Sequence, residues 1–331
     1  MKLQLVEQAF QYFDETATLI AKKKQISYLE GLIETTENIY DNALIDDYDE
    51  KTTEQLMTVY QSIREDQIDK DVLQKAFQFA VLKGMNEQKS FNYEPTPEAV
   101  GLLMAYLLQR ILPKEKRLSL LDLTVGTGNL VFQLKKQLPN LDVAGIDADP
   151  LLLRLAYVQA NLAEVQIELF HQDSVMPLYK EPVDVICSDL PIGYYPDKEV
   201  ARSFKVKAGN DDYTYIHHLL IEQSLHYLKE DGYAFFLIPN HLFVSEQAVY
   251  LKKMIEEEAI IYSVLQLPLS LFKEKQQARS ILFLRKKNKT VKKPKQTLVA
   301  SLPTFNNKED VREIMKEINK WIEENKDCFD N

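Results

Sequence analysis

The stretch Leu120–Leu130, LLDLTVGTGNL, decides the fold of this chain. A short apolar run ends on Asp122, and Gly126 and Gly128 follow before a helical pattern begins. Glycines let the backbone turn sharply and approach a ligand where a Cβ would clash. The pattern therefore predicts a strand, a ligand-binding turn and a helix, with a carboxylate at the carboxyl end of the strand.

This stretch belongs to a series of seven short apolar runs, most of them separated by helical patterns. The runs are LSLLDL (118–123), DVAGID (142–147), QIELFHQ (166–172), VDVICSD (183–189), YAFFLIP (233–239), YSVLQLP (262–268) and SILFLRK (280–286). Such alternation is typical of a largely parallel sheet with helices on both faces. Too few residues separate the last two runs for a parallel crossover, so we expect those two strands to pair antiparallel.

The rest of the chain suggests three domains. Residues 1–88 have helical periodicity and hold most of the acidic excess, and Gly84 is expected to end the last helix of this domain. Residues 89–290 contain the seven runs. Residues 291–331 read as a basic linker, a short strand TLVASLP (297–303) and a helix packed on the central domain.

Composition limits the function. The chain has 331 residues, a formal charge of -10 and two cysteines, Cys187 and Cys328. Two cysteines suit a reducing cytoplasm, and no run approaches the roughly 20 apolar residues of a membrane span. The acidic balance argues against tight autonomous binding to duplex DNA. The histidines show no metal-ligand spacing, so we expect no metal site.

Acidic residues also follow the next strands, and each suits one part of a nucleoside ligand. Asp122, just ahead of the glycine turn, suits a cationic ammonium group. Asp147 in GIDADP (145–150), about 20 residues on, occupies the position that commonly binds a ribose diol. Asp173 in FHQDSV (170–175) could accept a hydrogen bond from an adenine amino group, and Thr96 starts a helix near the methionine end. This set points to S-adenosylmethionine.

A dinucleotide-dependent oxidoreductase is the obvious rival. The glycine pattern of that class, G-x-G-x-x-G, has a third glycine, and Val131 stands in its place here. The pattern therefore disfavours a pyrophosphate-binding turn.

Several motifs occur in order with fitting gaps: YEPTP (93–97), DLTVGTGNL (122–130), GIDADP, HQDSV (171–175), SDLPIG (188–193), EDGYAFFLIPNHLF (230–243) and VLQLPLSLF (264–272) with SILFLRKK (280–287). In this combination the chain resembles class I S-adenosylmethionine-dependent methyltransferases. It is most similar to the N6-adenine DNA methyltransferase branch, which includes the type I restriction–modification methylation subunit and small stand-alone bacterial relatives. The resemblance implies a seven-stranded, mostly parallel Rossmann-like sheet with a reversed last strand, preceded by the helical domain.

The resemblance also implies a role for the turn after the fourth strand. In the family this strand ends in Asn or Asp, Pro, Pro and an aromatic, whereas this chain has Asp189, Leu190, Pro191 and Ile192. The first side chain and a neighbouring carbonyl would accept both N–H groups of the acceptor amine, and the aromatic would stack on a flipped base. Tyr194 or Tyr195 could replace the missing aromatic. The predicted catalytic set is Asp189, Leu190, Pro191 and Tyr194.

The resemblance implies S-adenosyl-L-methionine as the cofactor. The residues expected to bind it are Tyr93, Thr96, Asp122, Thr124, Gly126, Gly128, Asn129, Asp147, Ala148, Asp173, Ser174 and Asp189. The leading acceptor is adenine N6 in DNA or another nucleic acid, and RNA or a protein amide stay open.

One alternative to this function remains. The altered turn also suits a cofactor-binding protein with weak or lost catalysis that acts as an interaction module, and Asp189 could merely end a strand. The expected partners are nucleic acid, bound weakly or with assistance, a specificity partner or a second copy of the chain, and no membrane.

Overall fold

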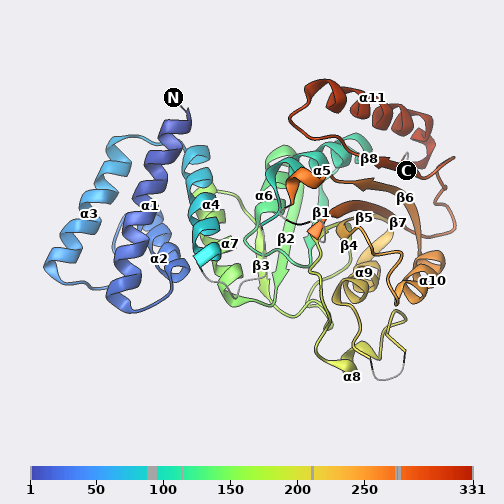
Figure 1. Ribbon diagram of the computed structural model, residues 1–331, viewed down its shortest axis with the longest axis horizontal. Helices are drawn as coiled ribbons and strands as arrows, with labels where there is room; N and C mark the ends of the chain where they lie inside the picture. The colour runs from blue at the N-terminus through green and yellow to red at the C-terminus, as the bar shows by residue number, and fades with distance from the viewer. Residues whose placement is uncertain are drawn as a thin grey trace. The chain divides into compact units, whose positions relative to one another are not determined.

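The computed structural model describes residues 2–87, 95–113, 115–209, 212–272, 274 and 277–329 (Figure 1). The chain divides into two compact units. The first comprises Met1–Pro95, Gly126–Gly128 and Asp149–Leu169, and the second comprises Thr96–Val125, Asn129–Ala148 and Phe170–Asn331. The predicted domain boundary at 88/89 falls outside the described residues, whereas the boundary at 290/291 lies within them, and both stay predictions.

The first unit is helical. Its helices are α1 (Lys2–Lys24), α2 (Tyr28–Asp41), α3 (Glu50–Glu65), α4 (Lys70–Glu87) and α7 (Pro150–Ala163). α2 begins with a capping box, in which the Ser27 side chain accepts from the Glu30 amide and the Glu30 carboxylate accepts from the Ser27 amide. Apolar faces of the helices meet in one core, where Phe13 and Phe77 pack edge to face. Burial of each such side chain contributes about 1.5–3 kcal/mol.

Gly84 does not end a helix as expected, because α4 continues to Glu87. A Cβ at Gly84 would lie 2.5 Å from Leu29 Cδ2 and 2.8 Å from Tyr28 Cδ1. The glycine therefore lets α4 pack closely against the start of α2, a need that the local sequence does not reveal.

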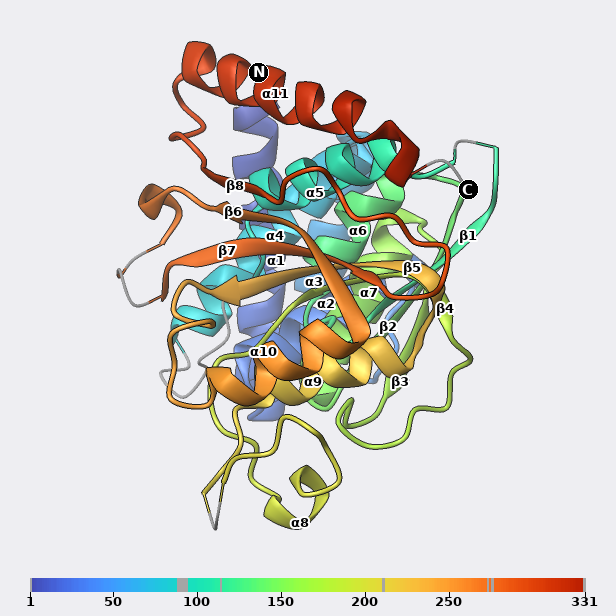
Figure 2. The same ribbon diagram turned by 90° about the vertical axis from the view of Figure 1, so that its right-hand side faces the viewer.

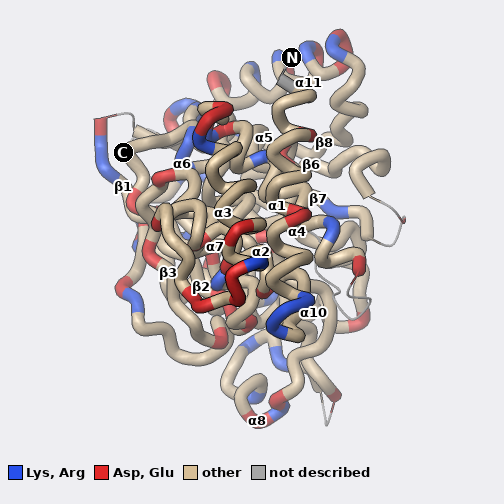
Figure 3. Tube along the Cα trace, turned by 90° about the vertical axis from the view of Figure 1, so that its left-hand side faces the viewer, with Lys and Arg blue, Asp and Glu red and all other residues tan. Residues whose placement is uncertain are grey.

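Ion pairs offset part of the acidic excess of the first unit, whose charged positions Figure 3 marks in red and blue. α1 ends in three lysines. Lys24 pairs with Glu34 at 2.5 Å and also with Asp46, and Lys23 pairs with Asp49 at 2.9 Å. These contacts tie the end of α1 to α2 and to the loop before α3.

The second unit is built on a sheet of eight described strands (Figure 2). The strands are β1 (Leu118–Asp122), β2 (Leu141–Asp147), β3 (Glu168–His171), β4 (Val183–Asp189), β5 (Leu228–Pro239), β6 (Ala259–Gln266), β7 (Arg279–Lys286) and β8 (Leu298–Ser301). Their order across the sheet is β3-β2-β1-β4-β5-β7-β6-β8. β7 is antiparallel to both β5 and β6, whereas the other described pairs are parallel.

Helices lie on both faces of this sheet (Figures 1 and 2). One face carries α5 (Glu98–Ile111), α6 (Asn129–Gln137) and α11 (Lys308–Glu324), and the other carries α9 (Ile216–His226) and α10 (Ala248–Glu258). The short helix α8 (Lys198–Ala201) lies in the connection between β4 and α9, and 3-10 turns form at Leu269–Leu271 and Lys326–Cys328. None of the helices in the described part of the chain is long and apolar enough to cross a membrane.

The predicted α/β class, the helical N-terminal region and all seven strands are confirmed, and the last two of these strands pair antiparallel. The expected count of seven is wrong, because TLVASLP adds β8 alongside β6. An edge strand leaves a row of N–H and C=O groups unpaired, and β8 satisfies that row on β6. The prediction that the last of the seven strands is reversed is confirmed: this strand is β7, which lies between β5 and β6.

The reversed strand brings a distant residue to the carboxyl edge of the sheet. In the strand registers, Asp189 at the end of β4 lies opposite Leu237 in β5, and Pro239 at the end of β5 lies opposite Arg279. Because β7 runs antiparallel, its first residue stands where β4 and β5 end. Arg279 is thereby placed beside the predicted catalytic turn.

Candidate active site

The segment that leads from β1 into the glycine turn is fixed by hydrogen bonds to β4 and β2, the strands on either side of β1. The amide of Leu123 donates to Ser188 Oγ at 2.9 Å, and the amide of Val125 donates to the Ile146 carbonyl at 2.9 Å. Gly126 has φ of 53° and Gly128 has φ of 87°, conformations that disfavour residues with a Cβ. The following helix α6 begins at Asn129. The turn thus has the backbone conformation that the sequence predicted.

Asp122 ends β1 as a buried acid, with 1% of its surface exposed. Its Oδ1 accepts from the Thr124 amide at 3.0 Å. Burial raises the pKa of Asp122 to about 7, and the nearby carboxylates of Asp189 and Asp147 contribute to this increase. Among the described residues no ion pair is recorded for Asp122. A buried acid in acidic surroundings is stabilised by a cationic ligand, so the site fits the ammonium group of S-adenosylmethionine.

One backbone and one side-chain contact join the ends of β2 and β3. The amide of Gln172 donates to the Asp147 carbonyl at 3.1 Å, and His171 Nε2 lies 3.1 Å from the Ala148 carbonyl. The Asp147 side chain is partly exposed, as a ribose-binding carboxylate requires.

Asp173 and Ser174 are both engaged by the protein. Asp173 Oδ2 accepts from the Tyr195 hydroxyl at 2.7 Å, and its Oδ1 accepts from the Val175 amide at 2.9 Å. Ser174 is buried and donates to the Leu123 carbonyl at 2.5 Å. Burial and the Asp173 carboxylate raise the pKa of Tyr195. Tyr195 is therefore a buried link between the predicted catalytic turn and the predicted adenine-binding segment, whereas Tyr194 is 54% exposed.

The turn after β4 converges on two partners from distant elements. Asp189 Oδ2 accepts from the Thr96 hydroxyl at 2.9 Å, and Asp189 Oδ1 lies 2.6 Å from Arg279 Nη1. The same Nη1 donates to the Leu190 carbonyl at 2.7 Å. The main-chain carbonyl of Asp189 accepts from the Thr124 hydroxyl at 3.0 Å. Thr96, Thr124 and Arg279 thus hold the Asp189–Leu190 segment.

Thr96 lies just before a helix, as predicted, but it is not the N-cap residue of that helix. α5 begins at Glu98 with Pro97 at the N-cap position and no capping side-chain bond. The buried Thr96 hydroxyl instead donates to Asp189, 93 residues away. Tyr93, the neighbouring prediction, lies outside the described residues.

Arg279 contacts the predicted catalytic turn but is not one of the predicted site residues. The sequence does contain a sign of it: Arg279 is a basic residue at the start of an apolar run that is expected to form an antiparallel strand. The first residue of such a strand lies at the edge of the sheet where the parallel strands end. The arginine side chain is 22% exposed and that of Asp189 17%, so the pair is largely shielded from water.

Aromatic rings form a column beside the turn. The rings of Tyr194 and Tyr215 stack with centroids 4.7 Å apart, and those of Tyr215 and His217 lie 5.1 Å apart at 24°. Burial lowers the pKa of His217 to about 4 and that of His218 to about 3, so both rings are neutral at pH 7. Tyr194 keeps an exposed ring, as a stacking residue requires.

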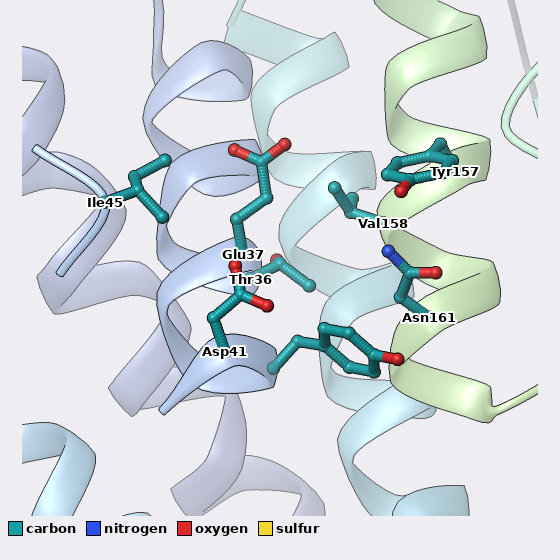
Figure 4. A pocket seen from close by; sticks show the side chains of 8 residues that line it. Thr36, Glu37, Asp41, Ile45, Tyr157, Val158 and Asn161 are labelled. Atoms are coloured by element: carbon teal, nitrogen blue, oxygen red, sulfur yellow. The ribbon is translucent and has the colours of Figure 1, made fainter. Parts of the chain in front are cut away.

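A separate hollow of about 290 Å³ lies in the first unit, between α2 and α7 (Figure 4). Its lining side chains are Thr36, Glu37, Tyr40, Asp41, Ile45, Tyr157, Val158 and Asn161. Burial raises the pKa of Glu37, and Arg154 Nη2 lies 3.8 Å from its Oε1. None of the predicted site residues lines this hollow. Within the described residues no group of three or more His, Cys, Asp or Glu is placed to hold a metal ion, and the absence of a metal site stays a prediction.

Comparison with known proteins shows which family this chain belongs to. The protein-family model described as N-6 DNA methylase matches residues 68–331. A second family model, described as the YtxK N-terminal helical domain, matches residues 7–85. An uncharacterised protein of Bacillus subtilis, YtxK, is 40% identical over 322 residues, which cover 96% of this chain and 97% of that protein.

Two solved structures are similar in fold to this chain. One solved as "a putative class I S-adenosylmethionine-dependent methyltransferase" of Listeria monocytogenes has a TM-score of 0.88 and 35% identity, covering 96% of this chain and 99% of that one. A type I restriction–modification methyltransferase subunit of Streptococcus thermophilus has a TM-score of 0.63 at 13% identity, covering 97% and 88%, a likeness of fold alone.

The sheet with one reversed strand, the glycine turn that follows β1 in the chain and these matches define the class of S-adenosylmethionine-dependent methyltransferases. Within it, the chain belongs to the N-6 DNA methylase family. Its cofactor is S-adenosyl-L-methionine, as the sequence predicted.

Proposed function

We propose that this methyltransferase transfers the methyl group to an amino nitrogen, with adenine N6 of DNA or another nucleic acid as the leading acceptor. One observation carries the proposal. Asp189 Oδ1 and the Leu190 carbonyl lie 2.6 Å and 2.7 Å from a single nitrogen, Nη1 of Arg279. Two oxygens that converge on one nitrogen suit an amine with two N–H groups.

The chain's own residues would act mainly by positioning. The lone pair of a purine amine is delocalised into the ring, so the amine is a poor nucleophile. Asp189 and the Leu190 carbonyl would each accept one N–H, which fixes the nitrogen and directs its lone pair away from the ring plane. Such alignment of the reacting atoms supplies a large part of a rate enhancement. Thr96 and Thr124, through their bonds to Asp189, would hold the acceptors in place.

The cofactor supplies an electrophilic methyl group when bound. We assign its ammonium group to Asp122, its ribose to Asp147 and its adenine to the Asp173 segment, where Ala148 and Ser174 would also line the site. Gly126 and Gly128, with positive φ, would allow close backbone approach, and Thr124 and Asn129 flank them. The buried, acidic surroundings of Asp122 support this assignment, because they favour a cation.

Assistance by a partner is part of the proposal. The formal charge of -10 disfavours strong binding to a polyanion without help. The fold is shared with methyltransferase subunits of type I restriction–modification systems. A specificity subunit, or a second copy of the chain, could supply the missing recognition surface. A cytoplasmic location also belongs to this proposal.

The test is methyl transfer from S-adenosylmethionine with a labelled methyl group to separate pools of DNA, RNA and cell protein. We expect label at adenine N6 in a nucleic-acid pool, detected as 6-methyladenine after digestion. Label confined to the protein pool would show that the methyl acceptor is an amide or amine of protein rather than adenine. No transfer to any pool, together with micromolar cofactor binding in calorimetry, would favour the interaction module over the enzyme.

A further inference from the structure

Arg279 makes the pair of hydrogen bonds that the proposed acceptor amine would need. Each terminal nitrogen of a guanidinium carries two N–H groups. Nη1 of Arg279 directs them to Asp189 Oδ1 at 2.6 Å and to the Leu190 carbonyl at 2.7 Å. This nitrogen therefore lies where an amino nitrogen bound by the same two oxygens would lie.

The two nitrogens cannot occupy this place together. Hydrogen-bonded nitrogens lie about 2.7–3.2 Å from each oxygen, so an incoming amine would overlap Nη1 in space. The remaining oxygens nearby are also engaged, because Asp189 Oδ2 accepts from Thr96 and the Asp189 carbonyl accepts from Thr124. A charge-assisted pair in a largely shielded place is stronger than a bond between neutral groups.

We propose that Arg279 is an internal occupant of the acceptor-amine site and controls which groups enter it. An acceptor amine binds only after the guanidinium of Arg279 leaves Asp189 and Leu190, and it then takes over both bonds. This inference rests on the proposed role of Asp189 and Leu190 as acceptors for the amine. Arg279 is thus a specificity-determining residue rather than a catalytic one.

The test measures binding of 2′-deoxyadenosine by calorimetry in the presence of saturating S-adenosylhomocysteine. We expect Arg279→Met, which keeps an apolar stem without donors, to bind the nucleoside at least about tenfold more tightly than the wild type. Deoxyinosine has a carbonyl in place of the amine and should gain nothing. A merely structural role for Arg279 would not separate these two nucleosides.

A matched control is available at the opposite edge of the sheet. Arg117 also pairs with an aspartate, Asp142, through two hydrogen bonds at 2.7 Å and 2.5 Å, just before β1. We expect Arg117→Met to bind deoxyadenosine as the wild type does. Affinity for deoxyadenosine that is unchanged or lower in a folded Arg279→Met variant would overturn the proposal.

Arg279→Met leaves the Asp189 carboxylate without its cation, so the variant could fail to fold. The double variant Asp189→Asn/Arg279→Met avoids this, because a neutral amide needs no cation and its oxygen still accepts an N–H. We expect the double variant to bind deoxyadenosine at least about tenfold more tightly than Asp189→Asn alone. Equal affinities in this pair would contradict the proposal.

The same variants separate failure of this inference from failure of the proposed function. Tighter binding of deoxyadenosine by Arg279→Met without methyl transfer to any pool would refute the proposed function and leave the role of Arg279 standing. Transfer by the wild type to adenine with unchanged binding in Arg279→Met would refute the role of Arg279 alone. When both hold, Arg279→Met should lower the KM for the acceptor more than it changes kcat.

Discussion

Two acidic residues at the same edge of the sheet have different surroundings. At the end of β1, Asp122 is buried, has no recorded ion pair among the described residues and has a pKa raised to about 7. At the end of β4, Asp189 pairs with Arg279 and also accepts from Thr96. The first region suits a cation supplied by a ligand, whereas the second already holds a cation supplied by the chain.

The difference teaches how one edge can serve two chemistries. Burying a carboxylate without a cation weakens the fold at neutral pH, and the loss is recovered when a cationic ligand binds. Pairing a carboxylate with an arginine avoids that loss, but a new ligand must then compete with the arginine. Under the proposed roles of Asp122 and Arg279, the first arrangement would favour tight cofactor binding and the second would favour selective entry of the acceptor.

The largest effect should come from removing the acceptor oxygen of the second region. We expect Asp189→Ala to lower methyl transfer by about 100-fold or more, because the amine loses one of its two partners and its orientation. Asp197→Ala, an exposed acid that caps α8, serves as the control in a labelled-methyl assay. Wild-type rates in Asp189→Ala would refute the role given to Asp189.

The pH dependence of stability should distinguish the two acids next. A buried acid whose folded pKa is raised binds more protons in the folded state, so stability falls as pH rises from about 4 to above 7. We expect Asp122→Asn to raise the free energy of unfolding by about 2–4 kcal/mol at pH 8 and by little at pH 4. Denaturant unfolding of both proteins at the two pH values measures this. A uniform gain at both pH values would contradict the raised pKa.

The same substitution should weaken the cofactor. We expect Asp122→Asn to lower the affinity for S-adenosylmethionine by roughly 10- to 30-fold, because a charge-assisted bond to the ammonium is lost. In the wild type the affinity should fall as pH drops below about 7, since the protonated carboxyl no longer attracts the cation. Calorimetry at pH 6 and pH 8 tests this. Equal affinities of the variant and the wild type for S-adenosylmethionine would show that another residue binds the ammonium group.

The smallest effect should come from the exposed ring beside the turn. We expect Tyr194→Ala to raise the KM for an adenine acceptor by about fivefold, the lower end of a base-stacking contribution. The loss is limited because Tyr215, on which Tyr194 stacks, remains. Tyr179→Ala removes a ring that is 87% exposed and should leave the KM unchanged. An unchanged KM in Tyr194→Ala would remove Tyr194 from the acceptor site.

Much of the framework could be predicted from local sequence. The seven strands follow from short apolar runs between helical patterns, and the turn follows from Gly126 and Gly128. The position of Asp122, Asp147, Asp173 and Asp189 at strand ends follows from the same runs. Parallel strands place such ends along one edge, so the neighbourhood of these acids could be expected without coordinates.

Other features could not be predicted, because they depend on pairings between distant residues. β8 joins the sheet through the free edge of β6, and Gly84 is required by the packing of α4 on Leu29 rather than by a helix end. Tyr195 is buried, and its hydroxyl donates to Asp173. Each outcome involves partners whose separation in sequence carries no periodic signal.

The sequence by itself determined the class of fold, the glycine turn and the acids at the strand ends, because residue spacing along one segment sets local structure. Only the tertiary structure decided that Asp189 holds Thr96 and Arg279, which lie 93 and 90 residues away. For Arg279 the reason is the reversal of β7, which brings the first residue of that strand to an edge where the other strands end. The sequence placed the acids at the strand ends, and the direction of β7 placed Arg279 beside one of them.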